Sequence, residues 1–259
     1  MNNRKKALLL AVLLTCSLHL VLPLQAFCQK QAEPKLEKWP ADLERDFALS
    51  SLPPHLRKDA TVYLLNPAKG FYVDKKGTNG FVCFVSRTEW EWGKFRNDFG
   101  AAMAYDAAGA TSIVRVYMDV AAMRASGKYT AAQVKNIVTD RIKKGIYKAP
   151  ARPGISYMLA PVMRAYPGGA ADDRVLTMGM PHYMFYAPYM NNADIGGSQQ
   201  EAPFLVNPGS DVLGNKKGPF GYIIVPVGEK EAAKIVKDNS ALLKRLAAYR
   251  AYFKVNTSM

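Results

Sequence analysis

Hydrophobic and polar residues alternate with a period of two in several stretches of the chain, which is the pattern of a half-buried β-strand. Residues 61–65, 71–74 and 81–88 carry this pattern, and residues 66–70 and 76–80 between them contain Asn, Pro and Gly. Short turns between successive strands predict an antiparallel β-meander. Both faces of the third strand are apolar, so we expect it to be central in the sheet and covered on both sides.

Later stretches with strand-like patterns are expected to extend the same sheet: residues 101–106, 110–117, 155–164, 175–187, 204–207 and 221–227. The first two would form a hairpin, and a helix over the alanine-rich residues 94–108 is the alternative. Pro226 near the end of the last strand favours an edge position, because proline cannot donate a hydrogen bond to a neighbouring strand.

Apolar positions spaced three and four residues apart predict three helices that cover this sheet. The first spans residues 41–50. The second begins at a capping box formed by Thr130 and Gln133 and ends at Gly145. The third, residues 229–254, is long, amphipathic and basic, so it would either cover the sheet or lie on an anionic membrane. The expected fold class is α+β, with a mainly antiparallel sheet covered by amphipathic helices.

The N-terminus has the pattern of a secretory signal peptide, residues 1–26. Basic residues 4–6 precede an uncharged apolar run, and Ala26 is the small residue before the polar sequence begins. Cleavage after Ala26, cleavage after Cys28 and retention as an anchor remain open alternatives. We expect the protein to be exported, periplasmic or secreted, with no stable transmembrane span after cleavage.

The rest of the chain divides into a polar, flexible tether at residues 27–38 and one α+β domain at residues 39–259. The formal net charge is +14, and +11 without the basic residues 4–6. A basic surface favours an anionic partner such as an envelope component, while export argues against nucleic acid. One of the three cysteines, Cys16, lies in the leader, so a disulfide framework is excluded and the fold must rest on its hydrophobic core.

Residues 174–197 form the stretch in which chemistry is most concentrated, because Met, Tyr, Phe and His alternate there. One interpretation is a buried strand in which methionine fills irregular gaps. A second is a Cu(I) or other soft-metal site, since thioether and imidazole groups suit such ions. In a regular strand the four candidate ligands would share one face, and the strand would have to bend for all four to reach one ion. The candidate ligands are Met178, Met180, His182 and Met184.

A binding module for a small amphipathic ligand is the function that the sequence favours, because aromatic and thioether side chains line pockets for partly apolar molecules. No cofactor motif is present in the sequence, so no cofactor is expected. The expected ligand-binding residues come from the predicted strands at residues 155–164 and 175–187 and from the loop after the second strand. They are His182, Tyr183, Met184, Tyr186, Tyr157, Met163 and Asp194.

A Cys-His hydrolase-like enzyme is the remaining alternative. Cys83 would be the nucleophile, His182 the base and Asp194 the residue that orients it. Cys83 lies within an apolar strand, where a buried thiol is usually inert, so the sequence favours binding over catalysis.

Three blocks of the sequence resemble a group of uncharacterised exported bacterial proteins. These are GTNGFVCFVSR at residues 77–87, ISYMLAPVMR at residues 155–164 and MPHYMFYAPYMNNADIGG at residues 180–197. The resemblance covers most of the chain after the leader and implies one continuous domain. It implies no catalytic or binding residue.

Overall fold

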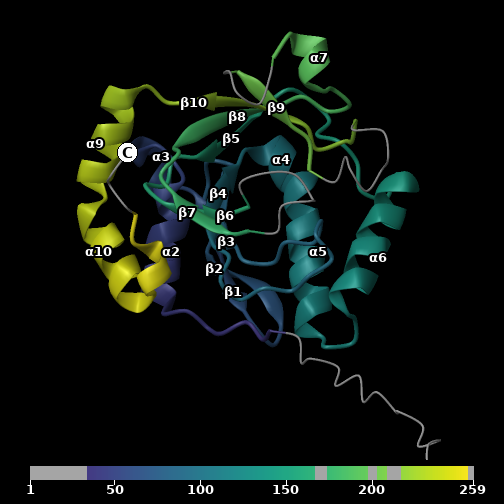
Figure 1. Cartoon of the computed structure of the whole chain (residues 1–259), viewed down its shortest axis with the longest axis horizontal. Coiled ribbons are helices and arrows are strands. Elements are labelled where there is room, and N and C mark those ends of the chain that lie inside the picture. The colour runs from purple at the N-terminus through teal and green to yellow at the C-terminus, as the bar shows by residue number, and fades with distance from the viewer. Residues whose placement is uncertain (1–33, 167–173, 198–202, 209–216, 256–259) are drawn as a thin grey trace, which may run out of the picture. The chain divides into compact units, whose positions relative to one another are not determined.

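A sheet of eight strands forms the centre of the computed structural model, which describes residues 34–166, 174–197, 203–208 and 217–255 (Figure 1). The strand order is β2-β1-β3-β4-β5-β8-β10-β9, and all neighbours are antiparallel except β1 and β3. A separate two-stranded sheet pairs β6 with β7. The strands are β1 (Thr61–Asn66), β2 (Gly70–Lys75), β3 (Val82–Ser86), β4 (Ala101–Tyr105), β5 (Ile155–Met158), β6 (Met163–Ala165), β7 (Leu176–Met178), β8 (His182–Tyr186), β9 (Phe204–Val206) and β10 (Tyr222–Pro226).

Helices cover both faces of this sheet, which confirms the predicted α+β single-domain fold (Figure 1). On one face α2 and α10 pack over the first strands, and Phe47 and Leu246 are fully buried there. On the other face α5 and α6 enclose a second core around Phe84 and Val134. The helices are α2 (Ala41–Ser50), α3 (Pro54–Arg57), α4 (Ala107–Thr111), α5 (Ile113–Ala125), α6 (Ala131–Lys143), α7 (Asn192–Ile195), α9 (Glu229–Asp238), α10 (Ser240–Tyr249) and the 3₁₀ turn η1 (Ala251–Phe253).

The predicted leader, residues 1–26, and the first part of the predicted tether lie outside the described residues. The last part of the tether contacts the domain. Arg124 donates a hydrogen bond to the Pro34 carbonyl over 2.7 Å, and Arg87 donates one to the Glu37 carbonyl over 2.7 Å. The Glu37 side chain also forms an ion pair with Arg250.

The predicted meander is correct for its first hairpin and wrong for its third strand. β1 and β2 pair antiparallel through the turn at residues 66–70. β3, however, lies on the other side of β1 and runs parallel to it, with Thr61 opposite Val82. The connection is held beside the start of β1, because the Thr78 and Asn79 amides both donate to the Asp59 carbonyl. β3 is nevertheless central and buried, as predicted, because β4 occupies its other edge.

The predicted hairpin at residues 101–106 and 110–117 is wrong in its second half, and so is the alternative helix over residues 94–108. The first stretch is strand β4, and the second lies in helices α4 and α5. The Asp106 carboxylate accepts hydrogen bonds from the Ala108 and Gly109 amides and thereby begins α4. Ile113, Val114 and Val116 favour strands locally, but in α5 they bury their side chains against the sheet.

Both long strands expected in the middle of the chain are interrupted. Residues 155–164 form β5 and β6, and residues 175–187 form β7 and β8, so β6 and β7 leave the large sheet and pair with each other. Pro181 stands at the second interruption, where its carbonyl accepts a hydrogen bond from the Val227 amide. The predicted edge position of the last strand is also wrong, because β10 lies between β8 and β9 with Pro226 as its last residue.

The predicted C-terminal helix is two helices and a 3₁₀ turn instead of one continuous helix. The break falls at Asn239, whose side-chain amide donates to the Ile235 carbonyl over 2.8 Å. By contrast, α2 spans the predicted residues, and the capping box of Thr130 and Gln133 is present at the start of α6.

Candidate functional site

The tyrosines predicted to bind ligand lie on opposite faces of the sheet. Tyr157 and Tyr183 are cross-strand neighbours, with ring centroids 5.8 Å apart, and the Tyr183 hydroxyl donates to Glu231 of α9 over 2.7 Å. Tyr186 points to the other face, where its hydroxyl donates to Asp106 over 2.9 Å. Burial is the largest cause that raises the pKa of Tyr186, followed by the Asp106 charge. Tyr186 therefore supports the start of α4.

The remaining predicted ligand-binding residues are also spread over the domain. Met184 is buried in the core between the sheet and α5, whereas Met163 packs with Phe99 beside the two-stranded sheet. Asp194 accepts a hydrogen bond from the Asn191 amide at the start of α7 and forms an ion pair with Lys217 over 3.0 Å. The predicted residues therefore do not gather in a single pocket among the described residues.

The four predicted soft-metal ligands are divided by the break between β7 and β8. Met178 and Met180 pack around Phe99, while Met184 faces α5. His182 is 3% exposed, and its Nδ1 is 2.7 Å from the Met180 carbonyl oxygen. Burial lowers the pKa of His182, so the imidazole is neutral at pH 7.

The three residues of the hydrolase alternative do not hydrogen-bond to one another in the described structure. Cys83 is free and fully buried on the α2 face of the sheet, and burial raises the pKa of its thiol to about 12. His182 is bound to the Met180 carbonyl, and Asp194 to α7 and Lys217. A thiol with so high a pKa is a poor nucleophile at neutral pH.

A pair of carboxyl groups that the sequence reading did not single out lies on the connection between β3 and β4. The Glu89 and Glu91 carboxyls lie close enough for each to shift the pKa of the other, through a side-chain hydrogen bond, and Ser86 donates to Glu89 over 3.1 Å. Burial is the largest cause that raises the pKa of both carboxyls, and the charge of Glu91 adds to it at Glu89. Both residues are half-buried when backbone and side chain are taken together.

Four tyrosines lie within electrostatic range of this pair: Tyr105 in β4, Tyr117 in α5, Tyr222 in β10 and Tyr166 just after β6. The Tyr105 and Tyr222 hydroxyls, from β4 and β10, are 3.2 Å apart. Burial is the largest cause that raises the pKa of Tyr105, to about 12, and the Glu89 charge adds to it. The charges of one or both carboxyls likewise add to burial in raising the pKa of the other three tyrosines. We call the following residues the carboxylate–tyrosine cluster: Glu89, Glu91, Tyr105, Tyr117, Tyr166 and Tyr222.

Trp92 extends this cluster with a second aromatic surface. Its ring stacks on Tyr166 with centroids 3.9 Å apart and planes 7° from parallel. The Trp92 Nε1 and the Tyr166 hydroxyl are buried atoms without a hydrogen-bond partner. Buried polar atoms are normally paired, so two such atoms in one stack indicate a place where a ligand or water would bind.

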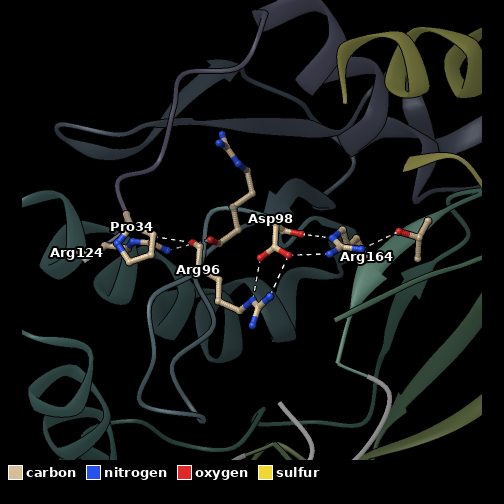
Figure 2. A network of polar contacts seen from close by, with 7 residues as sticks. Pro34, Arg96, Asp98, Arg124 and Arg164 are labelled. Atoms are coloured by element: carbon tan, nitrogen blue, oxygen red, sulfur yellow. Dashed lines mark hydrogen bonds and ion pairs between the residues drawn. The ribbon is translucent and has the colours of Figure 1, made fainter. Parts of the chain in front are cut away.

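The carboxyl pair differs from the nearby ionised carboxylate of Asp98, which is fully matched by cations (Figure 2). Arg96 and Arg164 both bind Asp98, and the hydrogen bond from Arg96 is the largest cause that lowers the pKa of Asp98, to about 2. Arg124 joins the same network by donating to the Arg96 carbonyl over 2.6 Å (Figure 2). This network connects the β3–β4 segment to β6 and therefore has a structural role.

The sequence does contain a signal for the carboxyl pair. Residues 88–92 read Thr-Glu-Trp-Glu-Trp, so two carboxyls and two tryptophans are concentrated in one short stretch of the chain. The tyrosines within range of the pair are separated by long stretches of sequence, so no local pattern relates them.

Comparison with known proteins gives no relative from which a function could be transferred. Among the residues that the structure describes, no helix is long and apolar enough to cross a membrane, and no group of three or more His, Cys, Asp or Glu side chains is placed to hold a metal ion. No protein-family model, curated protein or solved structure matches the chain.

Proposed function

We propose that this protein is a binding module for a small organic cation with an apolar body, and that the carboxylate–tyrosine cluster is its binding site. The observation that carries the proposal is the pairing of Glu89 and Glu91, two half-buried carboxyls whose raised pKa values favour a proton held between them. Two adjacent carboxyls that lack a bound cation cannot both ionise, because like charges repel at short distance. A cationic ligand would replace the shared proton.

Lys135 supplies only part of this charge. Lys135 on α6 lowers the pKa of Glu91, but its effect is smaller than that of burial, and the pKa remains raised. Carboxyls with raised pKa values and partial access to solvent are more typical of binding sites than of structural ion pairs. The charge balance therefore favours a cation from solution.

The aromatic side chains suit the organic part of such a ligand. Faces of tyrosine and tryptophan rings attract ammonium groups and also pack against apolar carbon. Tyr117, Tyr166 and Trp92 are half-buried, so part of each residue remains exposed. This combination favours a primary or quaternary amine with an apolar chain over a bare metal ion.

Calorimetric titration with a series of primary and quaternary ammonium compounds tests the proposal. Because the ligand displaces a shared proton, the binding enthalpy should change with the ionisation enthalpy of the buffer, in the direction of proton release. Affinity should rise with pH, since the pKa of both carboxyls is raised. The double variant Glu89→Gln with Glu91→Gln should lose binding, whereas Glu229→Gln, at an exposed position, should retain it.

Two outcomes would contradict the proposal. One is the absence of binding for every organic cation across the series. The other is equal affinity in the unmodified protein and the Glu89→Gln, Glu91→Gln variant. Thermal unfolding of the variant should be recorded alongside, so that loss of the fold is not mistaken for loss of the site.

An anionic envelope component is the second candidate partner, and a groove of about 530 Å³ at the end of α6 favours it. Arg115 and Lys148 line the groove, and the residues that form its wall include no Asp or Glu. Neither cation forms an ion pair within the described part of the chain. Co-sedimentation with phosphatidylglycerol vesicles, at low and high salt, tests this partner. Unchanged binding in an Arg115→Ala, Lys148→Ala variant would exclude the groove.

A further inference from the structure

Four methionines gather around Phe99 where the two-stranded sheet meets the large sheet. Met163 is buried in this cluster, and Met158, Met178 and Met180 pack against it while remaining half-buried. Met163 and Met178 are directly opposite each other in the β6–β7 pair. Side chains at such positions have Cβ atoms about 5 Å apart, so their thioethers are neighbours.

His182 adjoins this methionine cluster on two sides. It is directly opposite Met158 in the β5–β8 pair, and it follows Met180 by two residues. Its Nδ1 is 2.7 Å from the Met180 carbonyl oxygen. A carbonyl can only accept, so Nδ1 carries the proton and Nε2 presents a lone pair. Among the described residues, no side chain or backbone group hydrogen-bonds to Nε2.

This arrangement differs from an ordinary methionine-filled core in the state of the histidine. Metal-binding histidines commonly donate one ring N–H to a backbone carbonyl, which orients the other nitrogen toward the ion. His182 is 3% exposed and has that hydrogen bond already formed. The neutral imidazole and the uncharged thioethers match a soft monovalent ion better than a divalent one.

We propose that Nε2 of His182 and the thioethers of Met158 and Met180 bind Cu(I), with Met163 and Met178 forming the adjoining wall. The ligand set differs from the one expected from the sequence, because Met184 packs in the core next to α5 and Met158 lies directly opposite His182. The site is distinct from the carboxyl pair, and its occupation does not depend on the organic cation proposed above.

Anaerobic titration of the full chain with Cu(I), in competition with bicinchoninate and with ascorbate present, tests this site. We expect one Cu(I) per chain, and X-ray absorption should show sulfur and nitrogen ligands. The double variant Met158→Leu with Met180→Leu should weaken the affinity by about tenfold or more. Leucine nearly conserves the volume of methionine, so these variants should fold.

The matched control is Met118→Leu with Met123→Leu on α5, which changes two methionines packed in or against the core next to that helix. Its Cu(I) affinity should equal that of the unmodified protein. His182→Gln should lose the nitrogen ligand from the absorption spectrum. Absence of Cu(I) binding, or equal affinity in the Met158→Leu, Met180→Leu variant, would overturn the proposal. Titrating every variant with an organic cation in parallel separates failure of this site from failure of the carboxylate–tyrosine cluster.

Discussion

Glu44 offers the most quantitative test of the structure, because it is a buried acid whose protonation should control stability. It lies in α2, is 1% exposed, and accepts one hydrogen bond, from the Leu65 amide over 3.1 Å. Burial is the largest cause that raises its pKa from 4.5 to about 7, and the Arg87 charge opposes this rise in part. We predict that the free energy of unfolding of Glu44→Gln, relative to that of the unmodified chain, is larger at pH 8 than at pH 4.

The sign and size follow from linkage between proton binding and folding. The folded-state pKa lies above the unfolded value, so folding favours the protonated carboxyl. The stability that this proton provides is complete below pH 4.5 and is lost as the pH rises toward 7. The difference between the folded-state and unfolded-state pKa values of Glu44 corresponds to about 3 kcal/mol in the free energy of unfolding. Glutamine does not titrate and can still accept from Leu65, so the variant should escape this loss.

Urea unfolding at a series of pH values, followed by far-UV circular dichroism, gives the free energy of unfolding of both proteins. The difference between Glu44→Gln and the unmodified chain should grow by about 3 kcal/mol between pH 4 and pH 8. The exposed control Glu229→Gln should show no such trend. A difference that stays constant with pH would refute the reasoning, because it would mean that Arg87 keeps Glu44 ionised throughout.

Three further predictions concern other parts of the fold. Thr130→Ala should lower the free energy of unfolding by about 1 kcal/mol in urea, because the capping box is lost, while Thr130→Ser should retain most of it. Asp98→Asn should cost about 1–2 kcal/mol at pH 7, allowing for partial exposure. Since the pKa of Asp98 is lowered to about 2, that cost should fade in urea unfolding as the pH drops from 4 toward 2. Cys83 is fully buried with a pKa raised to about 12, so iodoacetamide at pH 8 should label it only on unfolding. Rapid labelling of the native protein, followed by mass spectrometry, would contradict its burial.

Sequence alone determined the features that depend on neighbouring residues. The limits of α2, the capping box at Thr130 and the β1–β2 hairpin were all predicted correctly. In each of these the stabilising contacts lie within a few residues, so local chemistry is sufficient. The α+β class followed from the mixture of two hydrophobic periods.

Tertiary contacts decided the features on which local preference and burial disagree. Residues 110–117 were predicted as a strand from their β-branched side chains, yet they lie in α4 and α5, where Ile113, Val114 and Val116 are buried against the sheet. β3 joins β1 in parallel, with its connection hydrogen-bonded to the Asp59 carbonyl beside β1. A strand pattern cannot show either outcome, since it contains no information about which surface a segment will meet.

The candidate sites show the same division between local and distant contacts. Alternation along the chain predicted Met178, Met180, His182 and Met184 as one group, but Met184 packs in the core next to α5, and pairing with β5 brings Met158 opposite His182. The carboxylate–tyrosine cluster draws on segments that lie more than one hundred residues apart in sequence, from Glu89 to Tyr222. The sequence shows which residue types are present, but only the packing of α5 against the sheet brings them together. Their charge state depends on burial, which the spacing of residues along the chain does not reveal.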